Sequence, residues 1–183
     1  MNDQTTSNVN AFFLKQAREY LSGDFLPKIE KSIENLSAQQ IWWRANDQSN
    51  SIGNLMLHLS GNARQWIVSG LGGAADHRVR QTEFDERRLL LKDELLNNLK
   101  ETVRDVDQVL AAFDGERLLD RFHIQEMDVI ALEAIFHVVE HFSMHTGQIL
   151  LLAKLLTGSD LGFYDFENDV PVQRWRSGPS DLS

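Results

Sequence analysis

Four stretches of the chain carry apolar residues at three- and four-residue steps, and this spacing constrains the fold more than any other feature. The stretches run from about Val9 to Leu36, over residues 52–67, from about Lys92 to Phe113 and from about Asp128 to Leu156. Residues spaced in this way fall on one face of an α-helix, where they can be buried together. The pattern therefore predicts an all-α fold, an antiparallel four-helix bundle.

The expected helix ends also carry sequence signals. Gly23 and Pro27 should kink or split the first helix, and Gly158 should end the fourth. Three polar residues can cap the second helix, and three glycines follow its last apolar residues. The candidate caps are Ser49, Asn50 and Ser51, and the glycines are Gly70, Gly72 and Gly73.

The segments between the helices read as connections. We expect residues 74–91, between the second and third helices, to form a long loop that spans the bundle or covers a site. Strand signals are weak throughout, so no β structure is expected. The whole chain, residues 1–183, reads as one domain, with about residues 1–8 disordered. The C-terminal tail carries enough aromatic and apolar residues to pack back onto the bundle; they are Phe163, Tyr164, Phe166, Val170 and Trp175.

Composition excludes several classes of function. With 27 acidic against 18 basic residues, the formal net charge is −9, which disfavours nucleic-acid and membrane partners. The chain has no cysteine, so it has no disulfide, no thiolate metal site and no sulfur nucleophile of its own. The opening residues MNDQTTSNVN show no secretory signal, and no apolar stretch reaches membrane-spanning length. We therefore expect a cytoplasmic protein.

Histidines are concentrated in the fourth predicted helix, in the segment HVVEHFSMH, where His137, His141 and His145 follow one another at four-residue steps. Two imidazoles four residues apart project from one helix face and can bind a single metal ion. A third ligand must come from another helix, and His58 lies in the middle of the second predicted helix. This spacing predicts a metal site formed by His58, His141 and His145, with His137 as a core or pocket residue.

A hydrogen-bonded polar network would explain the same pattern. Asn54, His58 and Asn62 share one face of the second predicted helix, and Gln148 shares a face of the fourth with the histidines. Unpaired polar groups on otherwise apolar helices are costly, so a metal ion or a network must satisfy them. Spacing alone leaves both alternatives open.

Several segments resemble a domain of unknown function in the DinB-like superfamily. They are SNSIGNLMLHLSGNARQWIVSGLGG from Ser49, DHRVRQTEFDER from Asp76, AIFHVVEHFSMHTGQILLLAKLLTG from Ala134 and DLGFYDF from Asp160, within a resemblance that covers about residues 10–166. That superfamily also includes the YfiT-like candidate metal hydrolases and thiol transferases. The resemblance implies a four-helix bundle and a three-histidine site. One histidine comes from the second helix and an HxxxH pair comes from the fourth, before a Gly-Gln step.

On this sequence, that pattern corresponds to His58, His141 and His145, with Gly147 and Gln148 as the Gly-Gln step. Many relatives have arginine before this glycine, where this chain has Thr146, so a role tied to that arginine is in doubt. The resemblance also implies a homodimer and a small-molecule substrate, which could be a thiol.

Three neutral imidazoles leave a divalent ion its full charge and an open coordination position, which is the layout of a catalytic site. All-imidazole ligation suits a divalent transition metal, with zinc as the first expectation and nickel or iron as alternatives. The resemblance suggests transfer of a low-molecular-weight thiol, or metal-assisted hydrolysis with Glu140 as the nearest acid in sequence. Glu140 points about 100° away from His141 around the helix, which favours a surface role. A non-catalytic helical stress-response or binding module is the remaining alternative.

The remaining charged residues of interest lie in the predicted long loop. Arg78 and Arg80 could bind a substrate carboxylate or phosphate. We favour the simpler interpretation that Arg–Glu pairs anchor this loop, with Glu83 and Phe84 as local contacts. His77 and His123 lie in predicted loops and should be solvated.

Overall fold

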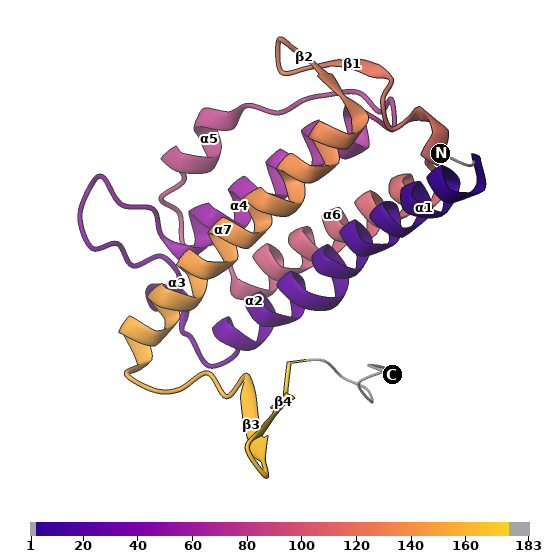
Figure 1. The fold of residues 1–183 in the computed structure, drawn as a ribbon. Helices are drawn as coiled ribbons and strands as arrows, with labels where there is room; N and C mark the ends of the chain where they lie inside the picture. The colour runs from indigo at the N-terminus through magenta and orange to yellow at the C-terminus, as the bar shows by residue number, and fades with distance from the viewer. Residues whose placement is uncertain (1–2, 176–183) are drawn as a thin grey trace.

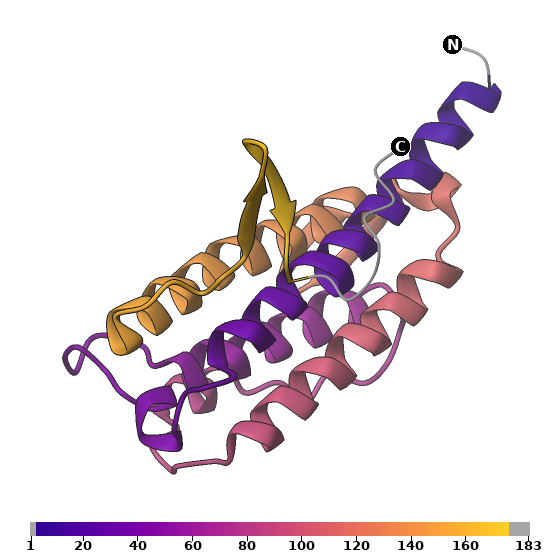
Figure 2. The same ribbon diagram turned by 90° about the horizontal axis from the view of Figure 1, so that it is seen from below.

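Four long helical segments lie side by side in the computed structural model, which describes residues 3–175 (Figures 1 and 2). The chain is mostly helical, as its sequence predicts. The first segment consists of α1 (Asp3–Glu19), the π-helical η1 (Tyr20–Phe25) and α2 (Leu26–Ile33). α1 thus includes residues 3–8, which we expected to be disordered. The π-helical turns contain Gly23 and lie just before Pro27. Proline has no N–H to donate to the preceding turn, so regular α-helical hydrogen bonding is interrupted there.

The second helix is α4 (Ile52–Ala63), which continues as the π-helical η2 (Arg64–Ser69). Of the three candidate caps, Ser51 is the one used. Its hydroxyl accepts a hydrogen bond from the Asn54 backbone N–H, and the Asn54 side chain accepts one from the Ser51 N–H. This reciprocal pair fixes where α4 begins.

The third and fourth helices are α6 (Lys92–Ala112) and α7 (Ala131–Thr157). α7 ends at Gly158, whose φ of 64° lies in the left-handed region that favours glycine. α4 packs against both α6 and α7, and α2 packs against α7. Side chains from all four segments form the core, including Ile29, Leu59, Leu99 and Phe142, each with no exposed surface.

The connections contain more regular structure than we predicted. Residues 37–50 include the short helix α3 (Ala38–Ile41), and the loop between η2 and α6 includes α5 (Arg80–Asp85). The short 3₁₀-helix η3 (Gly115–Arg117) follows α6. Figure 1 shows α5 lying beside the α4–α7 side of the molecule. The expected long loop is therefore present, and part of it is helical.

Two small antiparallel hairpins correct the expectation of an all-α chain without β structure. β1 (Arg121–Ile124) pairs with β2 (Met127–Ile130), and β3 (Tyr164–Glu167) pairs with β4 (Val170–Gln173). Each hairpin turns through two residues with positive φ, Gln125–Glu126 and Asn168–Asp169. Gln125 and Glu126 lack the Asn-Gly or Asp-Gly signal of such turns, so this hairpin could not be predicted from its turn residues. β2 also occupies residues 128–130, where we expected the fourth helix to begin.

The C-terminal tail packs back onto the bundle through two of the five residues expected to do so. Phe163 and Trp175 are buried, whereas Tyr164, Phe166 and Val170 are exposed. The Trp175 indole N–H donates a hydrogen bond to the Asp24 carboxylate on η1, at 2.9 Å. Within residues 3–175, no helix combines the length and apolar character that crossing a membrane requires.

Candidate metal centre

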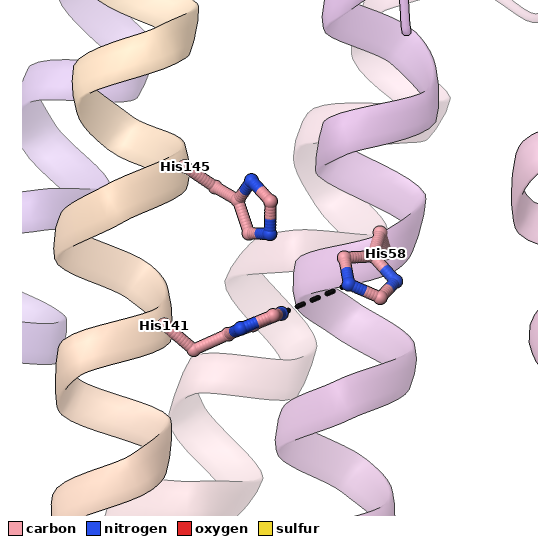
Figure 3. Close-up of side chains that lie close together, drawn as sticks. All are labelled: His58, His141 and His145. Carbon is pink, nitrogen blue, oxygen red and sulfur yellow. Dashed lines mark hydrogen bonds between the residues drawn. The ribbon is translucent and has the colours of Figure 1, made fainter.

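Three histidine side chains from two facing helices converge on one point between them. His58 comes from α4, and His141 and His145 come from successive turns of α7 (Figure 3). One ring nitrogen from each histidine lies within 4.8 Å of those of the other two. The ring centroids lie 4.8 Å apart for His58 and His141, 5.1 Å for His58 and His145, and 4.4 Å for His141 and His145. The convergence that the sequence predicted is therefore present.

The helices bring these polar rings into a largely apolar environment. His58 and His145 are 4% and 8% exposed, and His141 is partly buried. α4 and α7 pack directly against each other, so the middle of each helix faces the other. A polar nitrogen at this depth needs a hydrogen-bond partner or a metal ion.

The partner of His58 fixes which of its ring nitrogens carries the proton. Nδ1 lies 2.8 Å from Oε2 of Glu83 and, at the longer distance of 3.2 Å, from Nη2 of Arg78, which itself donates to the same carboxylate oxygen. A carboxylate oxygen only accepts, so Nδ1–H is the donor and Nε2 keeps its lone pair. That Nε2 faces the centre and lies 2.9 Å from Nε2 of His141, the contact drawn as a dashed line in Figure 3.

His145 is arranged in the same way with a local partner. Its Nδ1 lies 2.7 Å from the Gln148 side-chain oxygen, which accepts the Nδ1 hydrogen. Nε2 of His145 is then a bare acceptor, and it is buried without a hydrogen-bond partner among residues 3–175. Two of the three histidines therefore present unprotonated nitrogens for metal binding.

The electrostatic environment keeps the α7 histidines neutral. Burial, together with the charges that His145 and His58 would carry, lowers the pKa of His141 to about 3. Burial also lowers the pKa of His145, although its hydrogen bond to Gln148 acts in the opposite direction. Neutral imidazole is the form that binds a metal ion, so these two residues are ready to bind at neutral pH.

Glu83 and Arg78 belong to the site, although the sequence placed them only in an anchored loop. Arg78 donates from Nε to Glu83 Oε1 at 2.7 Å and from Nη2 to Oε2 at 3.0 Å. Burial raises the pKa of the Glu83 carboxyl, but hydrogen bonds from His58 and Arg78 outweigh it and hold the pKa below its ordinary value. The predicted Arg–Glu anchor is thus confirmed, and its carboxylate also contacts a candidate ligand.

Arg80, the other arginine considered for substrate binding, lies on the surface. Its guanidinium is 4.7 Å from the centre of the Phe84 ring, and that ring in turn lies 4.6 Å from the ring of His58. Arg78 is committed to Glu83 and to the Gln65 side-chain oxygen. The contacts of Arg78 therefore describe an anchor for the loop.

His137 lies next to the three-histidine group but outside it. Its Nε2 is 3.2 Å from the Asn62 amide nitrogen, and its ring packs against the Trp66 ring with the centroids 4.3 Å apart and the planes tilted by 41°. The expectation that it is a pocket residue agrees with these contacts. His77 and His123 are exposed, as expected, and Glu140 is exposed as well.

Comparison with known protein families gives a match over most of the chain. A family model described as a protein of unknown function (DUF1572) matches residues 8–165, a segment that contains the three histidines and the Arg78–Glu83 pair. No curated protein matches the chain.

Proposed function

The chain belongs to the DUF1572 family of proteins of unknown function, and on that premise we propose that it binds one divalent transition metal. The ligands are Nε2 of His58, His141 and His145. Zinc is the first candidate, because three imidazoles without a carboxylate suit zinc, nickel, iron or copper better than magnesium or calcium.

The observation that carries this proposal is the unpartnered Nε2 of His145. A hydrogen-bonded network would pair His141 Nε2–H with His58 Nε2, which lie at hydrogen-bond distance. It would leave the buried acceptor of His145 without a donor, at a cost of about 1–3 kcal/mol. A metal ion uses all three nitrogens at once, so it accounts for the group more completely.

We further propose that the chain is a DinB-like protein and that its centre serves an enzyme. The resemblance in the His58 block and in HFSMHTGQI supports the superfamily, as does the origin of the ligands on two facing long helices. A bound ion with an open position would supply Lewis-acid chemistry, by lowering the pKa of a thiol or water or by polarising a carbonyl.

Transfer of a low-molecular-weight thiol to an electrophile is the reaction we favour. The chain has no cysteine, so in such a transfer the sulfur would come from a small molecule. Hydrolysis needs a general base beside the centre, and the two acidic candidates are poorly suited. Glu83 is already bound to His58 and Arg78, and Glu140 is exposed.

A non-catalytic role is the second candidate, and the 2.9 Å approach of His58 Nε2 to His141 Nε2 favours it. In that case the histidines form a hydrogen-bonded cluster that holds α4 against α7 without a metal ion. Such a cluster would give the protein no more than a structural role at this position.

Metal analysis of protein purified without a histidine tag separates these candidates. We expect about one equivalent of metal in the unmodified protein, none in His58→Ala, and an unchanged content in His123→Ala, which removes an exposed histidine. If the metal-free protein does not bind added Zn²⁺, only the non-catalytic candidate remains.

The thiol reaction needs its own assay. Metal-loaded protein is mixed with a series of low-molecular-weight thiols and a generic electrophile, and the rate of thiol consumption is compared with that of the metal-free protein. A metal-dependent rate with one thiol supports the transferase, and equal rates with every thiol contradict it.

A further inference from the structure

We infer that Glu83 is a positioning residue for the metal centre, and that metal binding at the three histidines is coupled to docking of the Arg78–Glu86 segment on α4. This inference rests on the proposed metal function. It adds that a residue outside the proposed ligand set influences the affinity of the site.

The first step is the contact between Glu83 and His58. The carboxylate accepts the Nδ1 hydrogen at 2.8 Å and so holds the ring with Nε2 toward the centre. A negative charge behind an imidazole also makes the opposite nitrogen a better donor to a metal ion. His141 and His145 have no carboxylate among the hydrogen-bond partners found for their rings in residues 3–175. His58 is therefore the ligand whose strength depends on the loop.

The second step is that Arg78 compensates the negative charge of the buried Glu83 carboxylate. The Glu83 side chain is 10% exposed and that of Arg78 is 5% exposed. Arg78 binds both carboxylate oxygens, and its remaining terminal nitrogen donates to Gln65. Arg78 thus offsets the cost of burying the carboxylate and holds it against His58.

The third step is that α4 is shaped to admit this pair. Gly61 faces it, and a Cβ at residue 61 would overlap Glu83 Oε1 and approach Arg78 Nε. Glycine in the middle of a helix costs about 1 kcal/mol relative to alanine. The close approach of Glu83 explains why residue 61 is nevertheless a glycine. The absence of a side chain there lets Glu83 reach His58.

The fourth step is that the same segment is docked on α4 through its backbone. The Asn54 side-chain amide donates to the carbonyl oxygen of Glu83 at 2.7 Å and to that of Glu86 at 3.3 Å. Asn54 lies one helical turn before His58, so the docked segment and the metal ligand share one face of α4. Whatever undocks this segment also removes the partner of His58 Nδ1.

Coupling of this kind is reciprocal. If the docked segment strengthens metal binding through Glu83, then metal binding must stabilise the docked segment by the same factor. Metal should therefore slow amide hydrogen exchange in residues 78–86, although none of those residues is among the proposed ligands.

Two variants test the inference by independent routes. Glu83→Gln removes the charge with little change in shape, and Gly61→Ala displaces the unmodified carboxylate while improving helix propensity. Asp85→Asn is the matched control, since it makes the same charge change in the same short helix at an exposed residue whose side chain accepts only from Gln81 among the bonds found.

We measure the dissociation constant of Zn²⁺ by competition with a chromophoric chelator, and the visible spectrum of the Co²⁺-loaded protein. We expect Glu83→Gln and Gly61→Ala each to weaken Zn²⁺ binding by about 10- to 100-fold and to shift the Co²⁺ bands. Asp85→Asn should leave both unchanged. A purely structural role for Glu83 would lower thermal stability and leave the Co²⁺ bands of the folded protein in place.

The outcomes separate this inference from the proposed function. If the unmodified protein binds neither ion, the metal function itself is wrong. If it binds them and Glu83→Gln binds them equally tightly with the same spectrum, the metal function stands and the positioning role is overturned. Metal-dependent protection of residues 78–86 that disappears in Glu83→Gln would support the coupling directly.

Discussion

The two helices that form the centre hold their histidines by different means. On α4, His58 is held by a buried carboxylate 25 residues further along the chain, and an arginine compensates that charge. On α7, His145 is held by Gln148, three residues away on the same helix and exposed to solvent. The α4 half of the centre therefore depends on a docked loop, whereas the α7 half depends on local helix geometry.

Because of this difference, the two halves should control different properties: the stability of the region and its response to acid. The α4 half contains buried ionised groups, so its integrity should dominate the stability of the region. The α7 half carries neutral histidines whose pKa values are lowered, so it should dominate the response to acid. The predictions below test that division.

The largest effect is expected from breaking the buried pair. Arg78→Ala leaves the Glu83 carboxylate, which lies against α4, without its main partner. Removing one member of a buried ion pair costs about 3–5 kcal/mol of stability. Undocking of the loop would relieve part of this cost. We expect urea denaturation of the metal-free protein to show a loss toward the lower end of that range.

Arg88→Ala is the control for this measurement, because it also removes an arginine from a carboxylate of the same loop, yet the Arg88 side chain is 79% exposed. An ion pair with so exposed a member contributes at most about 1 kcal/mol, so this variant should lose much less stability than Arg78→Ala. Equal stability of the Arg78 and Arg88 variants would show that the α4 half is not held by its buried charges.

Acid should act mainly on the α7 half. The pKa of His141 in the folded protein is lowered from 6.5 to about 3, and the pKa values of His137 and His145 are lowered as well. Below about pH 6.5 the unfolded chain therefore binds protons that the folded chain does not. The free energy of unfolding must fall as the pH drops from there toward about 3.

Urea titrations of metal-free protein between pH 7.5 and about 5 check this prediction, because carboxylates titrate mainly below that window. His141→Gln should show a shallower decline than the unmodified protein. A decline of equal slope in both would mean that His141 is protonated in the folded state as readily as in the unfolded chain.

The two halves also differ in how far the sequence could predict them. The spacing of His141 and His145 follows from helix geometry, and His58 stands on a strongly periodic segment, so the ligand set could be proposed from local patterns alone. The long helices and the Ser51 cap are equally local features. The structure confirms the long helices, the cap and the convergence of the three histidines.

Glu83 could not be assigned in this way, because its contact with His58 depends on how a loop of low periodicity folds back onto α4. The one available signal was Gly61, a glycine within a helical pattern, which indicates close approach of another group without naming it. The β1–β2 hairpin was missed for a related reason, since Gln125 and Glu126 adopt positive φ against their usual preference.

A smaller effect is expected from the partner of His145. Gln148→Ala removes a neutral acceptor that competes with solvent, and the helix still directs the His145 ring toward the centre. We expect Zn²⁺ binding to weaken by less than about tenfold, and by less than in Glu83→Gln. The same chelator competition measures both variants. A greater loss from Gln148→Ala would reverse the ranking of the two halves.

The smallest effect is expected from Glu140, which sharpens the contrast between closeness in sequence and closeness in space. Glu140 adjoins His141 in the chain, yet it is exposed, and the rise that its charge causes in the pKa values of His137 and His145 is outweighed by the effect of burial. Solvent screens such a charge, so Glu140→Gln should change Zn²⁺ affinity by less than about threefold. The thiol-transfer rate should be equally insensitive, since the proposed chemistry assigns no proton transfer to this residue. If Glu140→Gln instead abolished a metal-dependent hydrolysis while metal binding persisted, the acid beside the ligand in sequence would be the functional one, and hydrolysis would replace thiol transfer as the proposed reaction.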